Sequence, residues 1–151
     1  MRKLTYFIDR GNEEFEPFYE YQVPQVGVDE IYARQLCTYF ILKGIQYQLM
    51  SNEMQGNEEI LVLEEMGPNH QLPDEQSYRG KGMNVEFRSS LPEENYRLLH
   101  VRPCDSHFEV IRFLLKDVVD IPFVCQMYTT STEIDEDRGV YVVYVKEIEA
   151  E

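Results

Sequence analysis

The sequence predicts an α+β fold in which a strand-strand-helix-strand-strand unit occurs twice, so that antiparallel sheets carry two helices about a pseudo-twofold axis. Two segments, 28–43 and 107–119, show the 3.6-residue apolar period of a helix. The segments around them alternate apolar and polar residues, as strands do, and are separated by turn residues. The order of these elements is the same in both halves of the chain, which favours a duplication; two unrelated hairpin units are the alternative.

The first half begins with two strands and ends with two strands. We expect these strands at 4–9, 15–23, 45–50 and 59–66, the last two joined by a turn at Gly56 and Asn57. Between the pairs, residues 28–43 place apolar side chains on one helical stripe. Gly27 before this stripe and Gly44 after it are suitable caps, so the helix is expected to fill the whole interval.

The second half repeats this order. Strands are expected at 83–88 and 96–102 before the helix, and at 123–129 and 140–146 after it. The helix over 107–119 opens with a capping box formed by Ser106 and Glu109, and Pro122 stops it. The last two strands are separated by an acidic turn that ends at Gly139.

Matching residues of the two halves have nearly constant separations. The separations are 80 for Phe7 and Phe87, 79 for Pro24 and Pro103, 78 for Gln48 and Gln126, and 80 for Val62 and Val142. We therefore interpret the chain as a single domain of two repeats, 1–66 and 83–148, joined by a polar linker over 67–82.

The negative charge of the chain argues against some classes of binding partner. Among 151 residues, 28 are acidic and 14 are basic, which gives a net charge of −14. Such a charge repels phosphate backbones and anionic lipids, so we expect no direct contact with nucleic acid or membranes. No apolar stretch is long enough to span a bilayer. The odd number of cysteines, three, fits buried thiols in a reducing compartment, and a cytoplasmic location is expected.

A duplicated unit of this kind buries one sheet face under its helix and leaves a place for a ligand between the halves. Gln48 and Gln126 occupy matching strand positions and are expected to face each other there. Tyr21, Tyr47 and Tyr128 belong to strands next to this interface and are expected to line the pocket. Amide and aromatic groups of this kind orient a small polar ligand.

The final part of the chain resembles a known family. The residues from Pro122 to Tyr128, an acidic turn and the apolar strand 140–145 resemble the gyrase-inhibitor-like (GyrI-like) effector-binding domains. The resemblance implies a non-enzymatic regulatory domain that binds a cationic aromatic molecule between its repeats. In that family a glutamate two residues before a tyrosine attracts the cation. Tyr128 matches the tyrosine, whereas Gln126 stands at the glutamate position and keeps only hydrogen bonding.

The sequence contains no catalytic motif, so we expect neither enzyme activity nor a cofactor. The densest group of potential metal ligands is His100, Cys104 and His107, with Asp105 or Cys125 as a fourth. This spacing matches no zinc finger, and we treat these residues as weak metal candidates only.

Two other functions are compatible with the sequence. The first is an acidic interaction module, of the inhibitor or immunity type, that masks a basic protein with Glu133, Asp135, Glu136 and Asp137. The second is a metalloprotein resembling the vicinal-oxygen-chelate enzymes. That class needs inward histidine and glutamate ligands on matching strands, and only His100 is suitably placed, with Tyr21 at its counterpart position.

Overall fold

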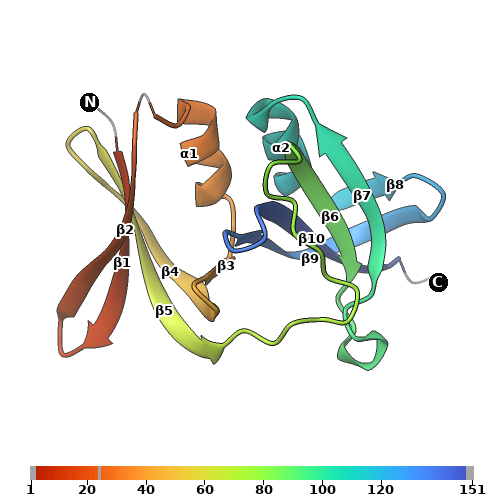
Figure 1. Ribbon diagram of the computed structural model, residues 1–151, viewed down its shortest axis with the longest axis horizontal. Helices are drawn as coiled ribbons and strands as arrows, with labels where there is room; N and C mark the ends of the chain where they lie inside the picture. The colour runs from red at the N-terminus through yellow and green to blue at the C-terminus, as the bar shows by residue number, and fades with distance from the viewer. Residues whose placement is uncertain (1–2, 24, 149–151) are drawn as a thin grey trace.

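The computed structural model describes residues 3–23 and 25–148, which form two helices and ten strands (Figure 1). The first half contains β1 (Lys3–Gly11), β2 (Glu14–Gln22), α1 (Val28–Gln35), β3 (Tyr39–Leu42), β4 (Ile45–Gln55) and β5 (Glu58–Pro68). The second half contains β6 (Met83–Ser89), the 3-10 turn η1 (Pro92–Glu94), β7 (Leu98–Cys104), α2 (His107–Leu114), β8 (Val118–Ile121), β9 (Cys125–Asp135) and β10 (Val140–Glu147). This composition confirms the predicted α+β class.

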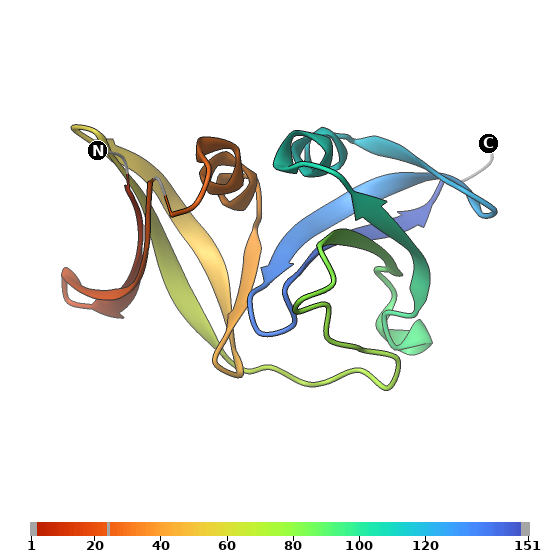
Figure 2. The same cartoon turned by 45° about the horizontal axis from the view of Figure 1, so that its top comes forward.

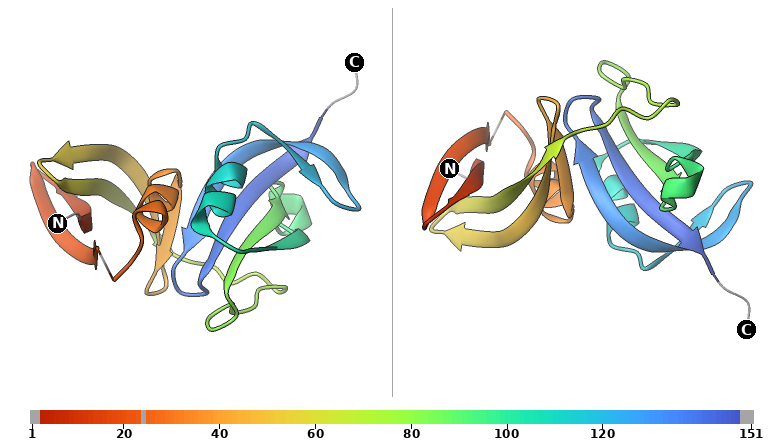
Figure 3. Two further views of the ribbon diagram at one scale, coloured as in Figure 1. Left: turned by 90° about the horizontal axis from the view of Figure 1, so that it is seen from above. Right: turned by 90° about the horizontal axis from the view of Figure 1, so that it is seen from below.

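The strands are linked by hydrogen bonds in the order β2-β1-β5-β4-β3-β9-β10-β6-β7, and β8 pairs with β9. Three pairs are parallel, β1 with β5, β10 with β6 and β3 with β9, and the other pairs are antiparallel. The sheet bends so strongly that each half curls around its own helix (Figure 2). The two helices lie side by side where the halves meet (Figures 1 and 3).

The order of pairing is the same in both halves. From the edge inward, the first half reads β2-β1-β5-β4-β3 and the second reads β7-β6-β10-β9-β8. The contact between the halves is not symmetric. β3 pairs with β9, but the equivalent pair, β8 with β4, is not formed in the described part of the chain. The pseudo-twofold axis is therefore not confirmed and stays a prediction.

The first helix is shorter than predicted. It begins after Gly27, as expected, but ends at Gln35, and the segment expected to continue it forms β3. Aromatic and β-branched residues favour a strand in this segment, and pairing on both sides with β4 and β9 satisfies its backbone. Gly44 is thus no helix cap: with Lys43 it forms a tight turn in which both residues have positive φ.

The second helix also ends early, at Leu114, and the rest of the predicted helix contributes to β8. Its start is as expected, since the Ser106 hydroxyl accepts a hydrogen bond from the backbone N–H of Glu109. The Glu109 carboxylate in turn accepts from the backbone N–H of Asp105. Pro122 therefore follows a strand, where it contributes to the turn into β9.

One buried apolar cluster contains residues of both halves. Tyr6 of β1 and Phe40 of β3 meet edge to face at 5.4 Å between ring centres, and Val110 of α2 and Val143 of β10 belong to the same cluster. Burial on this side leaves the opposite face of the β3–β9 pair for polar residues, because neighbouring residues of a strand point to opposite faces.

Two buried ion-pair networks hold acids of the second half, and the first of them joins the two halves. In the first, Glu136 accepts hydrogen bonds from the hydroxyls of Tyr6 and Tyr21 and from the guanidinium of Arg34, at 3.0 Å between Nη2 and Oε1. In the second, Arg138 donates to Glu86 at 2.9 Å and to Asp135 at 2.8 Å. Both arginines satisfy acids that would otherwise be buried without a partner.

The acidic turn expected before Gly139 is present over residues 136–139, but it is shorter and less exposed than predicted. Strand β9 continues to Asp135, and Glu133, Asp135 and Glu136 are only 5%, 1% and 9% exposed. Of the four acids proposed to mask a basic protein, only Asp137 is more than slightly exposed. It accepts hydrogen bonds from the backbone N–H groups of Lys43 and Gly44 in the β3–β4 turn.

The predicted linker contains no helix or strand from Asn69 to Gly82, although β5 extends to Pro68. It runs beneath the two halves (Figure 1) and is held against the second half by Tyr78, whose buried hydroxyl donates to Glu86.

The three cysteines are free: Cys37 and Cys104 are buried, while Cys125 is exposed, in contrast to the expectation of buried thiols. No helix among the described residues is long and apolar enough to cross a membrane.

Candidate functional site

The two halves meet at the parallel pair of β3 and β9, and the candidate site lies on the polar face of this pair. Tyr39 is the register partner of Glu133, and Ile41 that of Asp135. Residues that face each other across a strand pair share one side of the sheet. Phe40 and Ile134 point to the opposite side, into the apolar core, so the alternation of both strands places Tyr39 and Glu133 together outside it.

A pocket of about 620 Å³ opens over these residues, and we call it the seam pocket. Its volume lies within the range of small-molecule sites. Its walls come from the first half, the linker and the second half: Tyr39, Gln46, Met66, Asn69, His70, Leu72, Glu75, Ser90, Tyr96, Thr130, Ser131, Glu133, Asp135 and Tyr144. The pocket therefore exists only because the two halves are joined.

Glu133 differs from every other buried acid of the described residues. Four carboxylates and three guanidiniums are buried there: Glu86, Glu133, Asp135, Glu136, Arg34, Arg88 and Arg138. Three of the acids form ion pairs with these arginines, and Glu133 forms none in the described part of the chain. Its side chain accepts one long hydrogen bond, 3.3 Å from the Tyr144 hydroxyl.

The surroundings of Glu133 disfavour its charged form. Burial, together with the negative charge of Asp135, raises the pKa of Glu133 to about 8, while the hydrogen bond from Tyr144 acts in the opposite direction. Burial also raises the pKa of Asp135 and of Glu75, the other acids of the pocket. A positive charge placed beside Glu133 would stabilise its ionised form, because it would supply the partner that the protein does not provide.

Aromatic side chains surround this acid. The rings of Tyr96 and Tyr144 meet edge to face, 6.0 Å apart, and Tyr39 stands beside Glu133 in the strand register. Met66 and Leu72 add apolar surface on the other sides. Aromatic faces attract cations, so the tyrosines and the carboxylate favour the same kind of ligand.

None of the five predicted pocket residues lines the seam pocket as described. Tyr21 donates to Glu136 and lies under the Arg34 guanidinium, 4.4 Å from its carbon to the ring centre. Tyr47 is buried against Phe18, with 5.3 Å between ring centres. Tyr128 is 41% exposed near the outer end of β9. Tyr21 therefore belongs to the Glu136 network between the halves, and Tyr47 to the packing of the first half.

The two glutamines do not face each other. Gln48 is the register partner of Tyr39, which pairs with Glu133, whereas Gln126 lies seven residues before Glu133 on β9 and pairs with Asp120 of β8. At roughly 3.3 Å per residue, this offset amounts to about 23 Å along the strand. The expected meeting of the two amides fails because β3, which was predicted as helix, separates β4 from β9.

The weak metal candidates lie apart from one another in the structure. His100 is tilted over the ring of Phe87, His107 meets the edge of Tyr141, and the Cys104 thiol donates to the backbone carbonyl of Arg102. Burial raises the pKa of the Cys104 thiol to about 11. Within the described residues no three histidine, cysteine, aspartate or glutamate side chains are grouped to hold a metal.

Comparisons with known proteins give no further guide, since the chain matches no protein-family model, no curated protein and no solved structure. The site is therefore defined by its geometry alone. Sequence reasoning placed Glu133 on an exposed acidic turn and did not select Tyr39 or Tyr144 for a site. A usable signal is Ile134, an apolar residue between Glu133 and Asp135 as in a strand.

Proposed function

We propose that the protein is a binding domain for small organic cations, which it holds in the seam pocket. The observation that supports this proposal most is the lone buried carboxylate of Glu133 at the contact between the halves. A buried acid without a basic partner costs stability, and groups of this kind are concentrated at functional sites. A bound ammonium group would complete the pairing that Asp135, Glu136 and Glu86 obtain from arginine.

The rest of the pocket favours a ligand with an apolar or aromatic body. Tyr39, Tyr96 and Tyr144 offer ring faces, and Met66 and Leu72 offer aliphatic surface. Burial of such a body contributes binding free energy in proportion to its apolar area. The resemblance to GyrI-like domains, which stays a prediction, implies a ligand of the same class. Glu133 would then carry the negative charge that Gln126 lacks, farther along the same strand.

Isothermal titration with three compounds that share one body tests the proposal. The compounds are 4-phenylbutylamine, which is cationic, 4-phenylbutanol, which is neutral, and 4-phenylbutyrate, which is anionic. We expect the amine to bind in the seam pocket more tightly than the alcohol. Glu133→Gln should weaken the amine about tenfold or more and leave the alcohol unchanged, because a hydrogen bond to a charged group contributes roughly 1.5–3 kcal/mol.

The matched control is Glu53→Gln, which removes the same charge from an exposed residue of β4 outside the seam pocket. It should bind the amine like the unmodified protein. Equal affinities of the two variants for the amine, or equal affinities of amine and alcohol for the unmodified protein, would refute the role of Glu133.

A further inference from the structure

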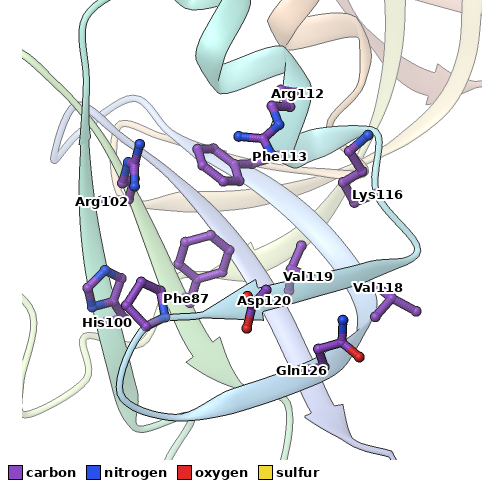
Figure 4. Close-up of a pocket in the computed structure, with 11 residues that line it drawn as sticks. Phe87, His100, Arg102, Arg112, Phe113, Lys116, Val118, Val119, Asp120 and Gln126 are labelled. Carbon is purple, nitrogen blue, oxygen red and sulfur yellow. The ribbon is translucent and has the colours of Figure 1, made fainter.

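A second pocket, of opposite charge, lies wholly within the second half. It has a volume of about 380 Å³ and is enclosed by α2, β7 and β8; we call it the α2–β8 pocket (Figure 4). Phe87 and Val119, which are 2% and 4% exposed, form its floor, and the ring of Phe113 stands edge to face with Phe87 at 5.7 Å. The floor is thus apolar, although His100, Asp120 and Gln126 also line the pocket.

Basic side chains gather around the opening of this pocket. Arg102 of β7, Arg112 of α2 and Lys116 just beyond α2 all line it. The guanidinium carbons of Arg102 and Arg112 lie 5.7 and 5.6 Å from the centre of the Phe113 ring. Three positive charges therefore meet at one small opening in a chain whose net charge is −14.

Only one of these charges is neutralised by the protein. Arg102 pairs with Glu109 at 2.9 Å, whereas neither Arg112 nor Lys116 forms an ion pair with any acid of the described residues. The negative end of the α2 dipole, at its C-terminus, stabilises a nearby cation, and this accounts for the presence of one of these two basic residues. It does not explain why both cations flank an aromatic-floored cavity. Arg112 and Lys116 are both exposed, so their mutual repulsion is weak, and an anion bound beside both would remove it.

We propose that the α2–β8 pocket binds a small organic anion, an aromatic carboxylate whose ring packs against the Phe87–Phe113 pair. The carboxylate would meet Arg112 and Lys116 at the opening, where a guanidinium pairs with both of its oxygens. Asp120 of β8 also lines the pocket and supplies the one negative charge. It repels a carboxylate and thereby turns the anionic end of the ligand toward the helix. This proposal is independent of the cation site, since the two pockets share no lining residue.

A two-dimensional amide NMR titration with 4-phenylbutyrate tests this assignment in the full chain. The largest shifts are expected in the backbone amides of residues 112–120, and the amides of 131–144 around the seam pocket should move little. The double variant Arg112→Gln/Lys116→Gln should weaken binding at least tenfold, because two charge-assisted contacts are removed. Lys81→Gln, an exposed cation in the linker, is the control and should bind as the unmodified protein does.

The variant Asp120→Asn provides a further test, because a general loss of stability would not tighten the binding of the anion. It removes a negative charge from the pocket, so it should tighten the binding of 4-phenylbutyrate. Weaker binding in this variant would overturn the proposal, as would shifts centred on residues 131–144 or unchanged affinity in the double variant. The spectra of the variants report at the same time whether each is folded. Glu133→Gln should leave the binding of the anion unchanged, which separates the outcome from that of the seam pocket.

Discussion

Glu133→Gln should stabilise the protein, and the gain should grow with pH. In the folded chain the pKa of Glu133 is about 8, whereas an unfolded glutamate titrates near 4.5. The folded state therefore binds the proton more tightly than the unfolded state does. Between pH 4.5 and 8 the unfolded state loses this proton first, so the free energy of unfolding falls as pH rises. Glutamine keeps the shape of the side chain and has no proton to lose.

The size of the effect follows from the shift. One pKa unit corresponds to about 1.4 kcal/mol, so the 2.5 units between 4.5 and pH 7 give a difference of about 3 kcal/mol in favour of the variant. The difference should be near zero at pH 4.5 and should level off at about 5 kcal/mol above pH 8.

Urea unfolding followed by circular dichroism, at half-unit steps from pH 5 to pH 8.5, measures this difference. Subtracting the unmodified protein from the variant cancels the contribution of other titrating groups. Glu53→Gln, at an exposed position of β4, should show no such trend. A difference between Glu133→Gln and the unmodified protein that stays flat across this range would refute the assignment of an unpaired buried carboxyl.

Three further predictions concern other parts of the molecule. Arg138→Met should lower the free energy of unfolding by about 3–5 kcal/mol, because Asp135 and Glu86 lose a buried partner; a loss below 1 kcal/mol in urea unfolding would contradict this. Phe123→Gly should raise the melting temperature, since Phe123 is fully exposed with φ of 63° and relief of this strain is worth about 1 kcal/mol; a lower melting temperature would show that its ring has a contact. Below pH 8 the affinity for 4-phenylbutylamine should rise about tenfold per pH unit, because the cation displaces the Glu133 proton; titrations at pH 6 and 7 with equal affinities would argue against this linkage.

Much of the fold was predictable from local sequence patterns. Apolar alternation located eight of the ten strands, since β3 and β8 were read as the ends of helices. In both cases a short apolar segment follows a true helix, and periodicity alone cannot distinguish a buried strand from a helical turn. Residues 39–42 become a strand through their neighbours, β4 and β9, which are distant in sequence.

The site was harder to predict because it depends on β3, which the sequence pattern predicts as part of a helix. With β3 taken as helix, Gln48 and Gln126 occupied matching positions and their meeting was a reasonable expectation. Once β3 stands between β4 and β9, Tyr39 and Glu133 become neighbours instead. The acids from Glu133 to Asp137 resemble a solvated turn in the sequence. The burial of Glu136 and of Asp135 depends on Arg34 and Arg138, and Arg34 lies about a hundred residues from Glu136 along the chain.

The most direct test observes the carboxyl carbon of Glu133 itself by carbon-13 NMR across a pH titration, with Glu133→Gln to assign the signal. In the free protein we expect its midpoint near pH 8, and saturating 4-phenylbutylamine should move this midpoint downward as the ammonium group pairs with the carboxylate. A midpoint near 4.5 in the free protein, or one that the amine does not move, would contradict a cation site at this residue.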